Sequence, residues 1–120
     1  MNYNGQDILK IFTSKFPGNA TLYFAPGRIN LLGEHIDYNA GFVMPAAITQ
    51  CFWFAIGEGK VNEFSVYSAT LDEFVSGNFS SIKKSTGWKN YILGVIDQFI
   101  QRGFSLEGFH AVFGGDLPVG

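Results

Sequence analysis

Residues 25–41, APGRINLLGEHIDYNAG, concentrate side chains that can do chemistry. A guanidinium, an imidazole and two carboxylates lie within ten positions, at Arg28, Glu34, His35 and Asp37. Carboxylates accept hydrogen bonds from hydroxyl groups, and charge-assisted bonds of this kind are strong and directional. The glycines of the segment allow sharp turns and a close approach of a ligand to the backbone. The segment therefore has the side chains needed to surround a small polyol.

Residue types and spacing leave three interpretations of this segment open. Arg28 could form a structural ion pair with Glu34 or Asp37, with the turn held by side-chain hydrogen bonds. The polar side chains could instead bind a ligand, or Glu34, His35 and Asp37 could hold a metal ion. Against the metal, the sequence has neither an HExxH pair nor a Cys/His spacing typical of zinc sites.

The composition places the segment in a folded, weakly acidic chain. A length of 120 residues favours one domain, and 47% apolar with 15% charged residues excludes a disordered chain. Eight cations against ten anions give a net charge of −2, so we expect no nucleic-acid partner. No stretch reaches the roughly 20 apolar residues of a membrane span. The lone cysteine, Cys51, predicts a buried thiol, and with no signal peptide we expect a cytoplasmic protein.

Periodicity and turn residues predict two helices and five strands around this segment. Apolar residues at helical spacing predict a first helix that stops at Pro17. A second helix is expected to be capped by Ser85 or Thr86 and to end at Gly103. The expected strands are 21–25, which runs into a turn at Pro26 and Gly27, then a buried strand at 48–56, and 61–67, 74–79 and 106–113. This order predicts an α+β fold rather than strict βα alternation.

Apolar side chains give the expected core. The stripe of the second helix is predicted at Trp88, Ile92, Val95, Phe99 and Ile100. The 13 phenylalanines are spread over nearly every expected element, and phenylalanine prefers burial. We therefore expect the phenylalanines to form core rather than an aromatic surface.

The stretch PGRINLLGEHIDYNAGFVMPAAI, residues 26–48, resembles the signature of the galactokinases, within the GHMP family of small-molecule kinases. The family's run is G-R-x-N-aliphatic-I-G-E-H-x-D-Y-N, and the chain follows it from Gly27 to Asn39. Two positions depart from it, because Leu32 stands where isoleucine is usual and Ile36 where threonine is usual. So many fixed positions make this resemblance far more specific than a lone glycine motif.

Three further segments resemble the same family. Residues 66–69, VYSA, are similar to the strand before the family's adenine pocket. Residues 88–95 are similar to the W-x-N-Y-x-x-G-V start of a family helix, and residues 116–120, DLPVG, to the lead-in of its phosphate loop. The resemblance therefore covers the whole chain and ends at the first glycine of that loop.

The resemblance implies a reaction in which ATP phosphorylates the C1 hydroxyl of D-galactose, with Mg²⁺. It implies that Glu34, His35 and Asp37 hydrogen-bond galactose and that Arg28 is catalytic, beside the C1 hydroxyl. Ser68 and Trp88 are implied to lie on the ATP side. The family's metal ligands and catalytic aspartate lie further along its sequence, so no metal ligand is expected in this chain.

The resemblance also implies a mixed β-sheet with helices packed on one face. We expect residues 1–120 to be a single partial domain, the N-terminal galactose-binding part of such a kinase, inactive alone. Surface exposed by truncation is expected to cause self-association. Two alternatives stay open: a related kinase of N-acetylgalactosamine or arabinose, and a non-catalytic sensor of galactose and ATP that regulates transcription.

Overall fold

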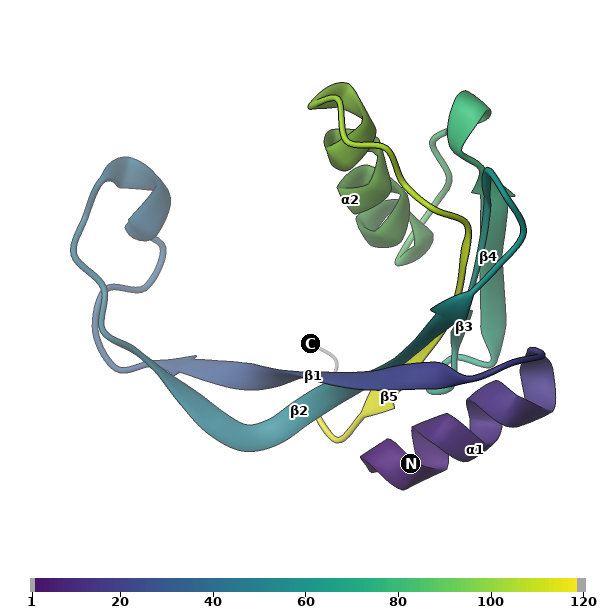
Figure 1. Ribbon diagram of the computed structural model, residues 1–120. Coiled ribbons are helices and arrows are strands. Elements are labelled where there is room, and N and C mark those ends of the chain that lie inside the picture. The colour runs from purple at the N-terminus through teal and green to yellow at the C-terminus, as the bar shows by residue number, and fades with distance from the viewer. Residues whose placement is uncertain (1, 119–120) are drawn as a thin grey trace.

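The computed structural model describes residues 2–118 and confirms the α+β class with a mixed sheet. The helices and strands are α1 (Gly5–Lys15), β1 (Ala20–Asn30), β2 (Pro45–Glu58), β3 (Glu63–Ser68), β4 (Glu73–Asn78), α2 (Lys89–Gln101) and β5 (Phe109–Gly115). Short 3-10 helices lie at Asp37–Asn39 and Phe79–Ser81. The five strands form one sheet in the order β1-β2-β5-β3-β4, with β3 and β5 parallel and the other neighbours antiparallel (Figure 1).

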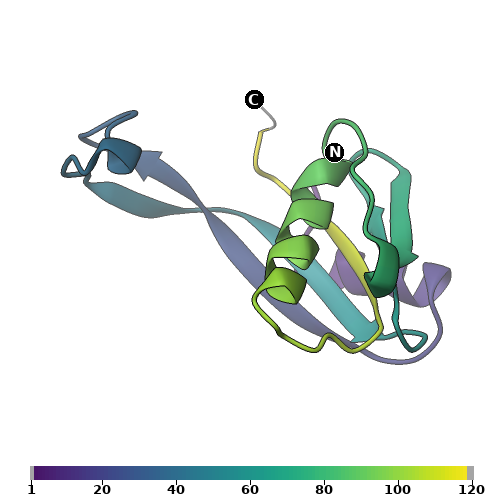
Figure 2. The same ribbon diagram turned by 90° about the horizontal axis from the view of Figure 1, so that it is seen from above.

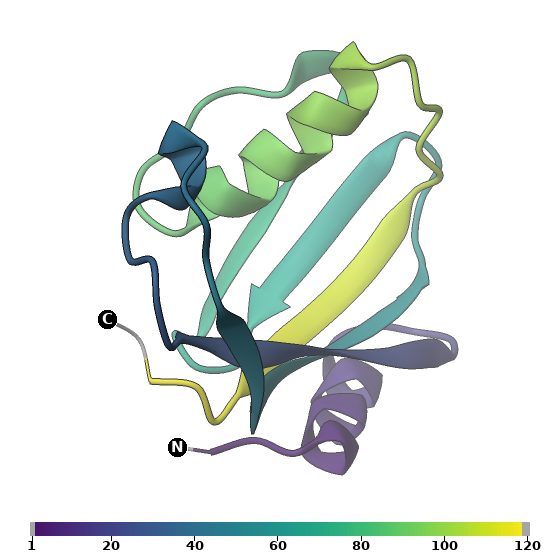
Figure 3. The ribbon, with the colours of Figure 1, turned by 90° about the vertical axis from the view of Figure 1, so that its left-hand side faces the viewer.

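The two helices cover opposite faces of the sheet, so the expectation that helices pack on one face is wrong (Figure 3). The cause lies in β5, where consecutive side chains point to opposite faces. Val112 is buried with Ile8 of α1, whereas Ala111 is buried with Leu93 of α2. Because this central strand is apolar on both sides, each face needs its own cover.

Helix α1 forms as predicted and is fixed at both ends by local signals. The Asn4 side chain accepts a hydrogen bond from the Asp7 backbone (3.0 Å), and the Asp7 carboxylate accepts one from the Asn4 backbone (3.1 Å). This capping box satisfies amides that have no partner within the helix. Ile8 and Phe12, one turn apart, are fully buried against the sheet. The helix ends at Lys15, two residues before Pro17.

Helix α2 begins differently from the prediction. Neither Ser85 nor Thr86 caps it; Trp88 takes the N-cap position and makes no side-chain cap bond. Instead, the Asn90 side chain accepts from the Ser85 amide (2.8 Å) and donates to the Ser85 carbonyl (2.6 Å). A side chain within the first turn thus holds the approaching loop, and the helix ends before Gly103 as predicted.

The buried face of α2 also differs in part from the predicted stripe. Leu93 and Ile96 are the buried residues of the helix, whereas Val95 and Phe99 are exposed. The other predicted members, Trp88, Ile92 and Ile100, pack at the edge of the same cluster. A helix with apolar residues on most sides permits more than one buried face, and the sheet selects between them.

The first two strands are longer and more exposed than expected. Strand β1 runs through Pro26 and Gly27, where we expected a turn, by a register shift between Pro26 and Arg28. Strand β2 is not a buried strand, since only Cys51 and Ala55 are buried along it. The burial predicted for the Cys51 thiol is confirmed, at 8% exposed. The far ends of the two strands and the loop between them, residues 28–45, extend away from the rest of the sheet as an arm (Figure 2).

Phenylalanine burial is only partly as predicted. Phe12, Phe16 and Phe64 are buried. Five phenylalanines are exposed: Phe24, Phe42, Phe74, Phe99 and Phe104. The prediction fails because these five rings lie where no other part of this chain covers them: on β1, in the loop between β1 and β2, on β4, on the outer side of α2 and just after it. None of the helices within residues 2–118 is long and apolar enough to cross a membrane.

Candidate functional site

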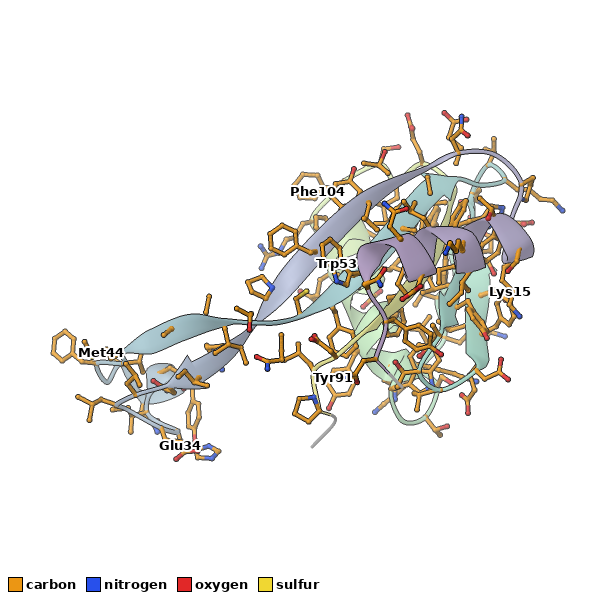
Figure 4. The ribbon with its side chains drawn as sticks, turned by 90° about the horizontal axis from the view of Figure 1, so that it is seen from below. Lys15, Glu34, Met44, Trp53, Tyr91 and Phe104 are labelled. Carbon is orange, nitrogen blue, oxygen red and sulfur yellow. The ribbon has the colours of Figure 1, made fainter. Side chains whose placement is uncertain are left out.

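The loop at the end of the arm, residues 31–44, carries most of the candidate site (Figure 4). Backbone bonds close it, from Leu31 N to Met44 O and from Met44 N to Leu32 O, each 2.9 Å. The Asn30 side chain adds a bond from Nδ2 to the Gly33 carbonyl (3.1 Å). Hydrogen bonds of the loop itself, rather than core packing, therefore position its side chains.

Left-handed backbone conformations turn the chain inside this loop. Gly33 has φ +87°, and a Cβ there would collide with the Phe42 carbonyl oxygen, so only glycine fits. His35 has φ +58°, a region that residues other than glycine rarely adopt. Its ring meets the Tyr38 ring edge-on at 6.4 Å. Outliers of this kind often lie at ligand sites, and this one directs an imidazole among the candidate residues.

Four predicted site residues meet in one hollow of about 330 Å³ at the base of the loop. Arg28 comes from the end of β1, Glu34 and His35 from the loop, and Asp37 from its 3-10 helix. Asn30, Val43 and Pro45 complete the lining. The structure thus brings together all the side chains expected to contact a sugar.

The charges in this hollow are not paired with one another. Among residues 2–118 the ion pair found is Lys89 with Glu73 (3.4 Å), far along the chain from Arg28. Arg28 therefore makes no structural ion pair with Glu34 or Asp37, which contradicts that part of the first interpretation, whereas the bond from Asn30 to Gly33 agrees with a turn held by side-chain hydrogen bonds. Unpaired acceptors and a planar donor around a hollow can instead hydrogen-bond a polyhydroxylated ligand.

The same residues do not fit a divalent cation. Within the described part of the chain no three His, Cys, Asp or Glu side chains gather closely enough to hold a metal ion. Mg²⁺ needs near-octahedral oxygen ligands. The hollow therefore offers hydrogen bonds rather than coordination.

Ser68 and Trp88 lie elsewhere, at the end of β3 and the start of α2. Ser68 is only 1% exposed, and its hydroxyl oxygen accepts from the Leu71 amide (3.3 Å), which holds the turn to β4. The Trp88 indole donates to the Glu73 carboxylate (3.0 Å), and its ring lies 5.7 Å from Phe113. Strand pairing places Ser68 beside these same two neighbours.

The electrostatics of that second region centre on Glu73. The hydrogen bond from Trp88, followed by the bond and charge of Lys89, lowers the pKa of the Glu73 carboxyl below its usual range. Glu73 is therefore held as an anion that fixes the first turn of α2 against β4. Ser68 and Trp88 thus share neighbours with each other, and neither lines the hollow of Arg28.

Two residues that contact β2 and β1 close to Arg28 in the sheet had no predicted role. The Asp116 carboxylate accepts from the Cys51 amide (2.8 Å), and the Leu117 side chain lies over Gly27. The only signal in the sequence is their place in the DLPVG run, of which residues 119–120 lie outside the described residues. Their contacts join segments that are far apart in the chain, so spacing could not have found them.

Comparison with known proteins finds one family repeatedly. A family model described as the galactokinase galactose-binding signature matches residues 10–58. The galactokinase of Clostridium tetani is 36% identical over 122 residues, which cover 99% of this chain and 31% of that relative. The crystal structure of Lactococcus lactis galactokinase complexed with galactose matches with TM-score 0.79 and 30% identity, over 92% of this chain and 30% of that one. The mevalonate kinase of Methanococcus jannaschii shares the fold, with TM-score 0.66 and 19% identity over 86% of this chain and 34% of that one.

Proposed function

Because this chain belongs to the galactokinase family, we propose that its arm supplies the galactose-binding face of an enzyme that converts D-galactose and ATP to galactose 1-phosphate and ADP. The chain spans about 31% of the length of the Clostridium tetani galactokinase. The reaction is therefore proposed for the whole enzyme, and residues 1–120 by themselves, one part of a larger domain, are expected to be inactive.

One observation carries this proposal. Arg28, Glu34, His35 and Asp37 converge on a single hollow, with no ion pair joining them within residues 2–118. All four lie inside the segment that matches the galactose-binding signature. Unpaired charge beside a hollow favours a ligand with many hydroxyl groups, since each hydroxyl can donate to a carboxylate.

Each side chain of the hollow has a distinct chemical part in the proposal. Glu34 and Asp37 accept hydrogen bonds from sugar hydroxyls, and His35 adds a ring nitrogen as a further partner. Arg28 lies beside the C1 hydroxyl. A guanidinium stays protonated at any working pH, so Arg28 takes no proton and instead stabilises negative charge that develops during transfer.

ATP belongs to the second region in this proposal. When bound, ATP supplies the γ-phosphoryl group that the C1 hydroxyl receives. Trp88 is partly buried and offers ring surface to a base, whereas the buried Ser68 hydroxyl shapes the turn beneath it. Mg²⁺ is expected to accompany ATP, and within residues 2–118 no cluster of three His, Cys, Asp or Glu side chains could hold it.

Calorimetric titration of D-galactose into the chain tests the sugar site. We expect measurable binding that is lost in Asp37→Ala and retained in Glu107→Ala, which removes an equal charge from an exposed loop elsewhere. Stronger binding of N-acetylgalactosamine or arabinose than of galactose would favour the alternative that the chain is part of a related sugar kinase. Equal binding by both variants would remove Asp37 from the site.

Self-association through the arm is the remaining part of the proposal. A monomer of 13.2 kDa is expected to expose about 6,400 Å², whereas this chain exposes 8401 Å². The difference exceeds the roughly 800 Å² per partner that a stable interface buries. A second copy of the chain packed on the exposed apolar side chains of residues 31–44, such as Leu32 and Phe42, would bury part of this excess. The cytoplasmic location stays a prediction from the single cysteine.

A further inference from the structure

The segment directly after β5 contacts β2 at Cys51 and β1 at Gly27, one residue before Arg28 of the candidate site. The last pair of the β2–β5 ladder joins Phe52 to Gly115. Beyond it, the Asp116 carboxylate accepts from the Cys51 amide (2.8 Å), and the Asp116 amide donates to the Cys51 carbonyl (3.3 Å). Asp116 thus continues the ladder with a side-chain oxygen in place of a backbone carbonyl.

Leu117 makes the contact with β1. A Cβ built at Gly27 would collide with the Leu117 side chain and approach Ile48 to 3.1 Å. Gly27 is buried and lies at the register shift between Pro26 and Arg28. The missing side chain of Gly27 therefore makes the space that Leu117 occupies, one residue before Arg28. Figure 3 shows the chain after β5 turning toward the part of β1 and β2 from which the arm extends.

We propose that Asp116 and Leu117 are positioning residues, which lock the segment after β5 to the strand that carries Arg28. These contacts hold β1 at Gly27, one residue before Arg28, against the segment after β5, and so fix the position of the guanidinium for phosphoryl transfer. This role rests on the proposed function, because the rate of phosphoryl transfer depends on the position of the reacting groups. It assigns to Asp116 a part distinct from those of the sugar-binding carboxylates.

The lone cysteine provides a direct measurement of the lock in this chain. Cys51 is 8% exposed, and its backbone amide is the partner of Asp116. Asp116→Ala leaves that amide unpaired, and we expect thiol labelling of Cys51 to become about tenfold faster. Asp116→Asn keeps an acceptor oxygen and should label at nearly the wild-type rate, as should the control Glu107→Ala. If Cys51 is labelled at the wild-type rate in Asp116→Ala, the proposed positioning role of Asp116 is wrong.

A kinetic measurement in the whole galactokinase separates positioning from sugar binding. Asp116→Ala and Gly27→Ala are expected to lower kcat about tenfold, with the KM for galactose unchanged within about twofold, and Asp116→Asn is expected to restore kcat. A rise in KM with unchanged kcat, or equal loss in Asp116→Asn, would overturn the proposal. If the wild-type chain fails to bind galactose, the proposed function fails, while the labelling of Cys51 still decides whether the lock exists.

Discussion

The body of the sheet and the arm are held together by different forces. In the body, two apolar clusters on opposite faces include fully buried side chains such as Phe12 and Val112. In the arm, no residue from 28 to 45 is buried, and backbone hydrogen bonds with left-handed turns maintain its shape. The radius of gyration is accordingly 15.9 Å, against about 13.6 Å for a compact chain of this length.

This difference separates stability from recognition along one chain. Burial stabilises the body, and the candidate ligand side chains are left on a surface that contributes little to the core. Regions with few buried contacts also open with the lowest free energies. Substitutions in the two regions should therefore change different measured quantities.

The largest effect is expected for the core of the body. Phe12→Ala removes a fully buried ring between α1 and the sheet and should lower the free energy of unfolding by about 3–5 kcal/mol. The matched change Phe42→Ala in the arm, where the ring is 97% exposed, should alter it by less than about 0.5 kcal/mol. Urea unfolding of both variants measures the contrast. Similar losses in the two would show that the arm belongs to the cooperative core.

The next effect concerns the hollow in the whole enzyme. Asp37→Ala removes a charged acceptor from bound hydroxyls. We expect kcat/KM for galactose to fall by an amount that corresponds to about 2–4 kcal/mol of lost transition-state stabilisation, with ATP affinity nearly unchanged. Thermal unfolding of the same variant should match that of the wild type, because Asp37 is exposed and makes no ion pair among the described residues. Unaltered galactose kinetics in the folded variant would make Asp37 structural.

Arg28→Lys tests whether Arg28 acts on the reaction or on the turn. Lysine keeps the charge but lacks the planar fork, so we expect kcat to fall about tenfold while galactose affinity stays close to normal. We expect little change in Tm, since the Arg28 side chain is exposed. Measurement of kcat, galactose Kd and Tm decides the matter: a lower Tm with normal kcat per folded molecule would assign Arg28 to the turn.

Self-association should depend on the arm and not on the body. Phe42→Ser removes the most exposed ring of the loop and should weaken association by about tenfold, measured by sedimentation or light scattering across concentrations. Val61→Ser, an equally exposed position outside the arm, is the control and should leave association unchanged. A wild-type chain that stays monomeric at high concentration would remove this part of the proposal.

The smallest effect is a pH dependence at the second region. The pKa of Glu73 is lowered in the folded chain, so its stabilisation is complete above its ordinary pKa and is lost as the pH falls through the lowered value. Trp88→Phe removes the first cause of the shift and should raise the Glu73 pKa toward its usual range. Carboxyl chemical shifts followed by NMR between pH 2 and 6 measure this. An unchanged titration would leave Lys89 as the main cause.

The sequence alone determined those features that depend on nearby residues. The stop of α1 before Pro17 was predicted from the sequence, and the capping box that joins Asn4 to Asp7 at its start is likewise a contact between near neighbours in the chain. The hollow gathers Arg28, Glu34, His35 and Asp37 because they lie within ten positions of one hairpin, so a short motif could indicate it. Short-range hydrogen bonds and turn chemistry encode such features directly.

Tertiary structure decided those features that depend on which apolar surfaces pack against each other. The sheet selected Leu93 and Ile96 as the buried side of α2, and the two apolar faces of β5 placed the helices on opposite sides. The bond from Cys51 to Asp116 joins residues 65 positions apart, and Leu117 reaches a glycine still further away. Such contacts depend on the folded positions of whole strands, which local propensity does not specify.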